Sequence, residues 1–198
     1  MSKKPIVKTK LPSVHGQFDI WAFEAEIAAM PHLALLSKGF DPSQTVNVRI
    51  HSECLTGDVF GSKRCDCGQQ LENALQYIEK NEGVLIYLRQ EGRGIGLTNK
   101  LLAYNLQDGG MDTIDANHAL GFQADQRIYD AAIEILESLQ INKVRLITNN
   151  PDKVDALVSK GFQVSEMVYL PTEHFSENKS YLETKANRLG HRFSLGEK

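Results

Sequence analysis

The sequence predicts an α/β fold, a layered mixed β-sheet flanked by helices, from three features. Short apolar runs at residues 84–87 and 144–148 are typical of strands that are covered on both faces. Apolar residues at helical spacing follow each run, so strands and helices alternate over residues 84–170. Aromatic and apolar residues over 17–40 indicate further β-structure. Because no repeat or long linker divides the 198 residues, we expect a single domain over 1–198.

The chain is mildly acidic, with a formal net charge of −3, which disfavours a nucleic-acid partner. The basic N-terminus has no apolar stretch, and no window approaches the roughly 18 apolar residues of a membrane span. We therefore expect a cytoplasmic protein with no membrane partner. Arg49, Arg89 and Arg93 nevertheless fall in or beside glycine-rich and cysteine-rich segments, and this local positive charge suits a small polyanion.

The first half of the chain contains one clear strand, at residues 46–50, which leads into the cysteine-rich segment. Residues 17–40 alternate only weakly, which indicates a short strand or two followed by irregular chain. After the last cysteine, apolar residues at helical spacing predict a helix that ends near Gly83. These apolar residues are Leu71, Ala74, Leu75 and Ile78.

The three cysteines, Cys54, Cys65 and Cys67, lie in one short polar segment. Their odd number and the lack of a secretory signal argue against a disulfide framework, so thiolate metal ligation is the better interpretation. Zinc accepts sulfur ligands readily, and three protein ligands leave its fourth position open for a water, which indicates catalysis. The alternatives are three unrelated buried cysteines, or a structural zinc closed by a fourth ligand from among His51, Asp66 and His118.

The strand at 84–87 runs into a glycine-rich turn at residues 89–96 and then into a helix. Backbone N–H groups in such a turn approach an anion closely, and Arg93 adds a planar bidentate donor. The pattern is therefore typical of a phosphate site, although many glycine-rich turns only reverse the chain.

The helix at 97–107 carries Leu97, Leu101 and Tyr104 on one face, which predicts a rigid, core-like position for the tyrosine. A second helix follows residue 127, because apolar residues again recur at helical spacing. They are Ile128, Ala131, Ala132, Ile135, Leu136 and Leu139. From the residues alone, Asp125 is the expected N-cap of this helix and Arg127 a surface residue of its first turn.

The remaining predicted elements are a strand at 144–148, a helix, a strand at 164–170 and a short helix at 180–189. Asn150 and Pro151 have the order of a cap and a first-turn proline. Thr148 and Lys153 would then lie beside a helix N-terminus, which is a second candidate anion site.

The cysteine segment, HSECLTGDVFGSKRCDCGQQL at residues 51–71, resembles the zinc motif of GTP cyclohydrolase II. That family opens the imidazole ring of GTP at the start of riboflavin synthesis. Four further blocks resemble the same family in the same order: RQEGRGIGLTNKLLAYNLQD, DTIDANHALGFQADQR, LITNNPDKV and YLETKANRLGH. The resemblance covers about residues 11–192 and is far more specific than a lone glycine pattern.

The resemblance implies a reaction for this chain. One zinc ion per chain, held by the three cysteines, would supply the attacking water, and the ring would open with loss of formate and pyrophosphate to give a diaminopyrimidinone ribosylamine phosphate. Magnesium would bridge the triphosphate oxygens. The family also forms homodimers. Because three thiolates leave a zinc site negatively charged, a nearby base is needed, with Glu53, Tyr104, Asp125 and, less favoured, Asp66 as the candidates.

The resemblance also implies roles for single residues. Tyr104 would assist proton transfer, Asp125 would accept a proton, and Arg127 would attack the α-phosphate to leave a covalent nucleotidyl-arginine. Because a guanidinium stays protonated and is a poor nucleophile, electrostatic stabilisation of the phosphate is the alternative for Arg127. The residues implied to bind substrate are Arg49, Ile50, His51, Ser52, Glu53, Gln70, Glu91, Gly92, Arg93, Thr113, Thr148 and Lys153.

Three other functions compete with this interpretation. Close relatives of the family can stop at the formamidopyrimidine nucleotide, after one hydrolysis instead of two. A zinc nucleobase deaminase shares the His-x-Glu sequence found at His51 and Glu53, but the Pro-Cys-x-x-Cys part of that signature is missing. A non-enzymatic zinc module that binds nucleic acid would need a fourth ligand, and the acidic balance disfavours it.

Overall fold

The structure is a computed structural model that describes residues 3–26, 29–173 and 175–178. The chain forms two compact units. The first, here the sheet unit, comprises Met1–His51, Leu71–Arg89 and Tyr129–Leu170, and the second, the cysteine unit, comprises Ser52–Gln70, Gln90–Ile128 and Pro171–Lys198. The single domain expected over 1–198 stays a prediction. The helix expected at 180–189 lies outside the described residues.

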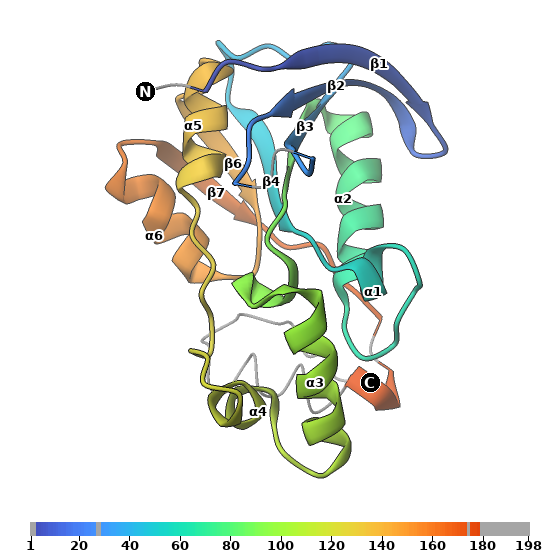
Figure 1. Cartoon of the computed structure of the whole chain (residues 1–198). Coiled ribbons are helices and arrows are strands. Elements are labelled where there is room, and N and C mark those ends of the chain that lie inside the picture. Colours follow the sequence, from blue (N-terminus) through green and yellow to red (C-terminus); the bar gives the residue numbers. More distant parts are fainter. Residues whose placement is uncertain (1–2, 27–28, 174, 179–198) are drawn as a thin grey trace. The chain divides into compact units, whose positions relative to one another are not determined.

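The described part of the sheet unit contains a seven-stranded sheet in the order β1-β2-β3-β5-β4-β6-β7. The strands are β1 (Val7–Ser13), β2 (Gly16–Phe23), β3 (His32–Ser37), β4 (Val46–Ser52), β5 (Gly83–Leu88), β6 (Lys143–Ile147) and β7 (Gln163–Val168). The β1–β2, β2–β3 and β3–β5 pairs are antiparallel, whereas β4, β6 and β7 run parallel. The predicted α/β class with a mixed sheet is confirmed (Figure 1).

The described helices are α1 (Leu55–Asp58), α2 (Cys67–Asn81), α3 (Gly96–Asp108), α4 (Thr113–Ala119), α5 (Asp130–Ser138) and α6 (Pro151–Ser159), with 3-10 turns η1 (Glu91–Gly94) and η2 (Ser176–Asn178). Of these, α2 runs from the cysteine unit into the sheet unit, and α1, α3 and α4 belong to the cysteine unit. Within the ranges that the structure describes, no helix is long and apolar enough to cross a membrane.

Helices cover both faces of the sheet, because its strands alternate apolar side chains between two cores. In β5, Val84 and Ile86 belong to the larger core with α5, whereas Leu85 belongs to the smaller core with Ala74 and Ile78 of α2. Figure 1 shows α2 on one side of the strands and α5 and α6 on the other. The short apolar runs predicted as two-sided strands are therefore confirmed in β5.

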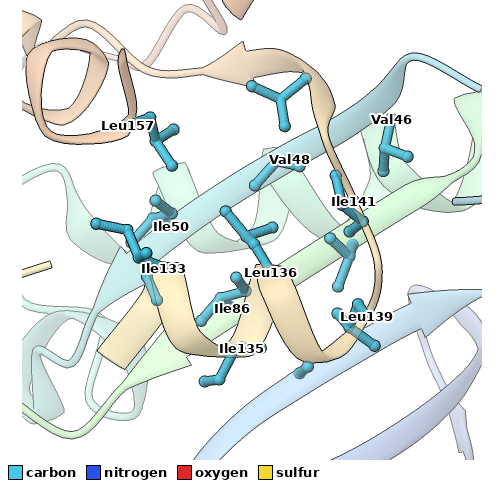
Figure 2. Packing of buried hydrophobic residues seen from close by; sticks show 14 of the residues in the cluster. Val46, Val48, Ile50, Ile86, Ile133, Ile135, Leu136, Leu139, Ile141 and Leu157 are labelled. Atoms are coloured by element: carbon cyan, nitrogen blue, oxygen red, sulfur yellow. The ribbon is translucent and has the colours of Figure 1, made fainter. Parts of the chain in front are cut away.

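The larger core lies where α5 and α6 pack on β4 and β5. Figure 2 shows Val48 and Ile86 close to Leu136, with Ile50 near Ile133 and Leu157. Burying one such side chain contributes about 1.5–3 kcal/mol, so this interface fixes the helices on the sheet.

The N-terminal region contains more β-structure than the sequence indicated. β1 begins at Val7, and β3 lies where irregular chain was expected. β1 is exposed along most of its length, so it lacks the clear in–out alternation that identifies a strand in a sequence. Pairing with β2 makes it a strand, and Lys8 adds a cation–π contact with Trp21, with Nζ 3.4 Å from the ring centroid.

The start of α5 differs from the prediction. Tyr129 is the N-cap residue and Asp130 the first helical residue, so Asp125 is not the cap. Ile128 precedes the helix and is 60% exposed, so it does not belong to the apolar stripe. The carboxylate of Asp125 instead accepts a hydrogen bond from the backbone N–H of Arg127, which forms a local turn before the helix.

The sequence did not predict α4, because seven residues are too short to show a helical period. Its start is nevertheless encoded by a cap, since Asp112 Oδ1 accepts from the backbone N–H groups of Ile114 and Asp115 at 2.7 and 2.9 Å. The predicted cap of α6 is confirmed by the same geometry, with Asn150 Oδ1 accepting from Asp152 N at 3.0 Å.

Leu136 provides a test of the larger core. Its side chain is fully buried, so Leu136→Ala should lower the free energy of unfolding by about 2–5 kcal/mol through lost contacts and a cavity. Urea unfolding followed by circular dichroism measures this change. Val158→Ala on α6 is the control, because Val158 is 54% exposed and its loss should cost less than about 0.5 kcal/mol. Similar small effects for both variants would contradict the core assignment.

Candidate metal centre and nucleotide-binding residues

The three cysteines converge in the cysteine unit. Cys54 immediately precedes α1, Cys65 lies in the loop that follows, and Cys67 begins α2. Their Sγ atoms all lie within 4.8 Å of one another, and Cys54 Sγ is 3.7 Å from Cys65 Sγ. A tetrahedral zinc ion with Zn–S bonds of about 2.3 Å requires sulfurs roughly 3.8 Å apart. The three side chains therefore fit a zinc ion.

Two glycines allow these sulfurs to meet. A Cβ atom on Gly68 would lie 2.3 Å from the carbonyl oxygen of Gly57. A Cβ atom on Gly57 would lie 3.0 Å from Cys65 Sγ and 3.2 Å from Cys54 Sγ. Neither position has room for a side chain, so glycine at both is what lets α1 and the start of α2 approach closely.

A fourth protein ligand does not join the cluster within the described part of the cysteine unit. The group of His, Cys, Asp and Glu donors there contains the three cysteines only, so neither Asp66 nor His118 completes the coordination. Asp66 is buried and instead accepts a hydrogen bond from Gln70 Nε2 at 2.5 Å. Three ligands favour an open zinc position over a closed structural one.

The three cysteines are hydrogen-bonded to one another, and this shifts their pKa values in opposite directions. Hydrogen bonds from Cys65 and Cys67 lower the pKa of Cys54, and positively charged Lys100 acts in the same direction. The same hydrogen bonding to Cys54 raises the pKa of Cys65 to about 11 and raises the pKa of Cys67. Since thiolates are the ligands, a metal ion must displace protons to bind here.

The glycine-rich turn is tied through Glu91 to the segment that carries the cysteines, residues 54–67, here called the cysteine loop. Its Oε2 accepts from the backbone N–H of Leu55 at 2.6 Å, and its Oε1 accepts from the N–H of Gly92 at 2.7 Å. Gly92 and Arg93 have φ values of 61° and 62°, in the left-handed region. The predicted strand, turn and helix are confirmed as β5, η1 and α3.

Arg93 connects this turn to the segment that contains Asp125. Its Nη1 donates to the carbonyl of Ala124 at 3.3 Å, and its own carbonyl accepts from Gln126 N at 3.1 Å. Gly94 has φ +96°, and a Cβ atom there would lie 3.2 Å from Gln126 Cβ. The turn thus holds residues 124–126 by close backbone contact.

Asp125 and Arg127 form an ion pair in this segment. Arg127 Nε donates to Asp125 Oδ1 and Oδ2 at 2.9 and 3.0 Å, and Nη2 also donates to Oδ2. The Arg127 side chain is 14% exposed, so it is not the surface residue expected from the sequence. Burial raises the pKa of Asp125, but hydrogen bonds from Arg127 lower it more, and the net pKa lies below its usual value.

Tyr104 has polar and cationic neighbours within the cysteine unit. Its hydroxyl is 3.3 Å from Thr56 Oγ1, and the Arg64 guanidinium lies 4.8 Å from the ring centroid. Leu101, on the face predicted to hold the tyrosine, is 45% exposed, so it does not belong to a buried core. Burial raises the pKa of Tyr104, so the phenol is protonated at neutral pH.

The other predicted residues of the cysteine unit occupy varied positions. Ser52 Oγ accepts from Gln90 Nε2 at 2.9 Å, and Glu53 is buried. Thr113 begins α4 and lines a surface pocket together with Arg64.

In the sheet unit, predicted residues gather where the parallel strands β4 and β6 end. The register of this pair, Val48 opposite Leu146, places Arg49 beside β6, and its Nη1 donates to the carbonyl of Ile147 at 3.1 Å. Thr148 follows β6 directly. Carboxyl ends of parallel strands are the usual place for ligands in α/β sheets.

Lys153 and His51 complete this group. The buried Nζ of Lys153 donates to the carbonyl of Ile50 at 2.8 Å. Thr148 Oγ1 accepts from Asn150 N at 3.0 Å, at the start of α6, and His51 stacks on Tyr87 with ring centroids 5.5 Å apart.

Comparison with known proteins decides the family. Residues 4–169 match the family model described as GTP cyclohydrolase II. The chain belongs to the GTP cyclohydrolase II family. The resemblance seen in the sequence, and the expectation of an enzyme of this family, are confirmed.

Relatives match over nearly the whole chain. GTP cyclohydrolase-2 of Shewanella piezotolerans is 51% identical over 195 residues, which cover 98% of this chain and 95% of that protein. The riboflavin biosynthesis protein RibBA of Chlorobium phaeovibrioides is 49% identical over 189 residues, covering 95% of this chain and 46% of that protein. This chain therefore spans about half the length of that relative. A solved structure of RibBX, a two-domain 3,4-dihydroxy-2-butanone 4-phosphate synthase from A. baumannii, matches with a TM-score of 0.45 and 18% identity, over 87% of this chain and 41% of that chain.

Sequence reasoning missed three residues in this member of the GTP cyclohydrolase II family. Lys100, Thr56 and Arg64 all contact Cys54 or Tyr104. The signal for Lys100 was its spacing, since a residue four positions before Tyr104 lies on the same helical face. Thr56 and Arg64 gave no signal of their contacts with Tyr104, because Tyr104 lies on another segment of the chain.

The Gly68→Ala variant tests whether the close approach of Gly68 to Gly57 is needed to bring the three cysteines together. In an unobstructed helix, replacing glycine by alanine would stabilise the helix by about 1 kcal/mol. Here the added Cβ atom would lie 2.3 Å from the carbonyl oxygen of Gly57. We expect zinc affinity, measured by chelator competition, to fall by at least about tenfold. Val59→Ala in the same loop is the control, because Val59 is 64% exposed and should leave zinc affinity unchanged. Unchanged zinc binding in Gly68→Ala would show that the glycine contact is dispensable.

Proposed function

We propose that this protein opens the imidazole ring of GTP by hydrolysis, with release of formate and pyrophosphate. The product would be 2,5-diamino-6-(5-phospho-ribosylamino)pyrimidin-4-one, and the reaction would be the first step of riboflavin biosynthesis. The observation that carries the proposal is the group of three sulfur ligands without a fourth described ligand, in the unit that also holds Tyr104 and the glycine-rich turn. The names of relatives such as GTP cyclohydrolase-2 of Shewanella piezotolerans support it.

The metal centre would consist of one zinc ion per chain on Cys54, Cys65 and Cys67. Zinc bound there supplies Lewis-acid activation of the attacking water. Magnesium, a hard cation that prefers oxygen ligands, would accompany the triphosphate. A homodimer and a cytoplasmic location stay predictions.

Tyr104 would act as the proton donor for loss of formate. The leaving nitrogen of the formamide must be protonated when its C–N bond breaks, so a positioned acid is needed. The phenol of Tyr104 is protonated at neutral pH because burial raises its pKa, and its hydroxyl is oriented by Thr56 at 3.3 Å. These two properties suit a general acid.

Asp125 and Arg127 would carry out the cleavage at the α-phosphate. A guanidinium nitrogen of Arg127 would attack phosphorus, the bond to pyrophosphate would break, and the guanidinium proton would pass to Asp125. Water would then hydrolyse the phosphorus–nitrogen bond. The two-pronged contact of Asp125 with Arg127 fixes the guanidinium orientation, which supports this role. Electrostatic stabilisation by Arg127 is the alternative, because a guanidinium is a weak nucleophile.

The remaining predicted residues would bind GTP. In the sheet unit, Arg49 and Lys153 provide positive charge near the ends of parallel strands, as a nucleotide phosphate requires. In the cysteine unit, Arg93 and the backbone of Gly92 provide donors on the glycine-rich turn. The other proposed contacts are Ile50, His51, Ser52, Glu53, Gln70, Glu91, Thr113 and Thr148.

The two half-reactions should separate by mutation. Cys65→Ser should abolish zinc binding and formate release but keep pyrophosphate release, because only ring opening uses the metal. Arg127→Ala should slow pyrophosphate release by roughly 10²–10³-fold. Incubation with GTP and magnesium, with zinc, formate and pyrophosphate measured separately, tests both.

Two results would count against these assignments. A Cys65→Ser protein that still releases formate would exclude the metal centre. Normal pyrophosphate release by Arg127→Ala would exclude the nucleophile, and Arg127→Lys, which keeps the charge without the planar fork, distinguishes geometry from charge.

The Tyr104→Phe variant should accumulate the formamidopyrimidine nucleotide. The substitution removes the proposed proton donor but keeps the aromatic ring of the side chain. General-acid loss should slow formate release by about 10²–10⁴-fold while ring opening continues. Mass analysis of the products distinguishes the two nucleotides. If the unmodified protein itself yields the formamide without formate, the reaction stops after one hydrolysis, and ammonia release with intact rings would indicate a deaminase instead.

A further inference from the structure

Lys100 is a buried lysine of α3 that has no role in the reaction proposed above. Its side chain is 11% exposed, and its Nζ lies 3.0 Å from Cys54 Sγ, 2.9 Å from Thr56 Oγ1 and 2.9 Å from Glu91 Oε1. An ammonium group has three protons, so these three acceptors use its full donor capacity. Such complete satisfaction indicates a fixed position.

The negative partner of Lys100 is equally fixed. The Glu91 side chain is 10% exposed, and its carboxylate also accepts the backbone N–H groups of Leu55 and Gly92. Burying two charges is costly unless both are paired and hydrogen-bonded, and here both conditions hold. The lysine therefore joins α3, the glycine-rich turn and the cysteine loop.

Backbone packing keeps this arrangement tight. A Cβ atom on Gly92 would lie 3.1 Å from Lys100 Cβ, so the turn rests directly against the stem of the lysine. The ammonium is thereby held at the sulfur of Cys54 and has little freedom to move toward solvent.

The positive charge of Lys100 lies beside a site that would be negatively charged with zinc bound. Three thiolates and one divalent zinc ion carry a net charge of about −1, which weakens the ability of the ion to polarise a bound group. A cation that donates to one of the sulfurs withdraws electron density from that ligand and offsets the negative charge. Groups that hydrogen-bond metal ligands orient them and tune the metal in this way.

We propose that Lys100 is a positioning residue for the metal centre: its ammonium holds the Cys54 sulfur as a metal ligand and increases the Lewis acidity of the bound ion. This inference rests on the proposed zinc centre. Lys100 itself contacts neither substrate nor metal in this role. It acts through Cys54, and through Glu91 it holds the glycine-rich turn on the cysteine loop.

Cobalt substitution tests the electronic part of the proposal. Cobalt(II) bound to thiolates shows a sulfur-to-metal charge-transfer band, whose energy falls when the sulfur loses a hydrogen bond from a cation. Lys100→Met should therefore shift this band to longer wavelength. Chelator competition should show zinc affinity reduced by about 10–100-fold, and the rate of formate release should fall.

Further variants separate charge from folding. Lys100→Gln keeps a donor without the charge, and Lys100→Arg keeps the charge and should restore the band position in part. If Lys100→Met does not fold, because Glu91 is left buried and unpaired, the double variant Lys100→Met with Glu91→Gln removes both charges together. Lys80→Met, at an exposed lysine in the last turn of α2, is the matched control and should behave as the unmodified protein.

The outcomes are distinguishable. A charge-transfer band that is present in the unmodified protein and unchanged in Lys100→Met would overturn the role of Lys100 while leaving the zinc centre intact. Reduced zinc affinity with an unchanged band would also overturn it, because the lysine would then only support the loop. Absence of any band in the unmodified protein would remove the zinc centre and this inference with it.

Discussion

The contact between the backbones at Gly57 and Gly68 is the constraint on which the cysteine unit depends. Because the carbonyl of Gly57 occupies the space that a Cβ atom on Gly68 would need, α1 and the start of α2 can approach this closely only with glycine at position 68. That separation brings sulfurs from both segments within 4.8 Å of one another. The convergence of the three cysteines therefore depends on the glycines at positions 57 and 68.

The cysteine unit contains two ion pairs that are largely shielded from solvent. Lys100 with Glu91, and Arg127 with Asp125, are shielded pairs in the cysteine unit, whereas Arg145 with Glu166 in the sheet unit is an exposed pair. An exposed pair contributes about 0–1 kcal/mol, and a buried pair is weak evidence for stability because desolvation offsets its attraction. The two shielded pairs therefore orient side chains within the cysteine unit more than they stabilise its fold.

The sheet unit depends on a different interaction, the burial of apolar side chains on both faces of β4 and β5. The parallel pairing of β4 with β6 sets their register. Because Val48 lies opposite Leu146, this register places Arg49 of β4 near Thr148, which follows the end of β6. A packed sheet holds such residues more precisely than a loop does, because neighbouring strands restrict the backbone. Ligands of open α/β sheets commonly bind at such strand ends.

The sequence by itself determined the features that depend on a few neighbouring residues: the two-sided strand β5, the apolar face of α2, the cap of α6 at Asn150 and the family motif around the cysteines. Only the tertiary structure decided that Asp125 pairs with Arg127 instead of capping α5, and that Lys100 is buried against Cys54. The reason is distance along the chain. A cap or an apolar period is complete within one or two turns, whereas Glu91 meets Leu55 across 36 positions and Lys100 meets Cys54 across 46, and only packing brings such residues together.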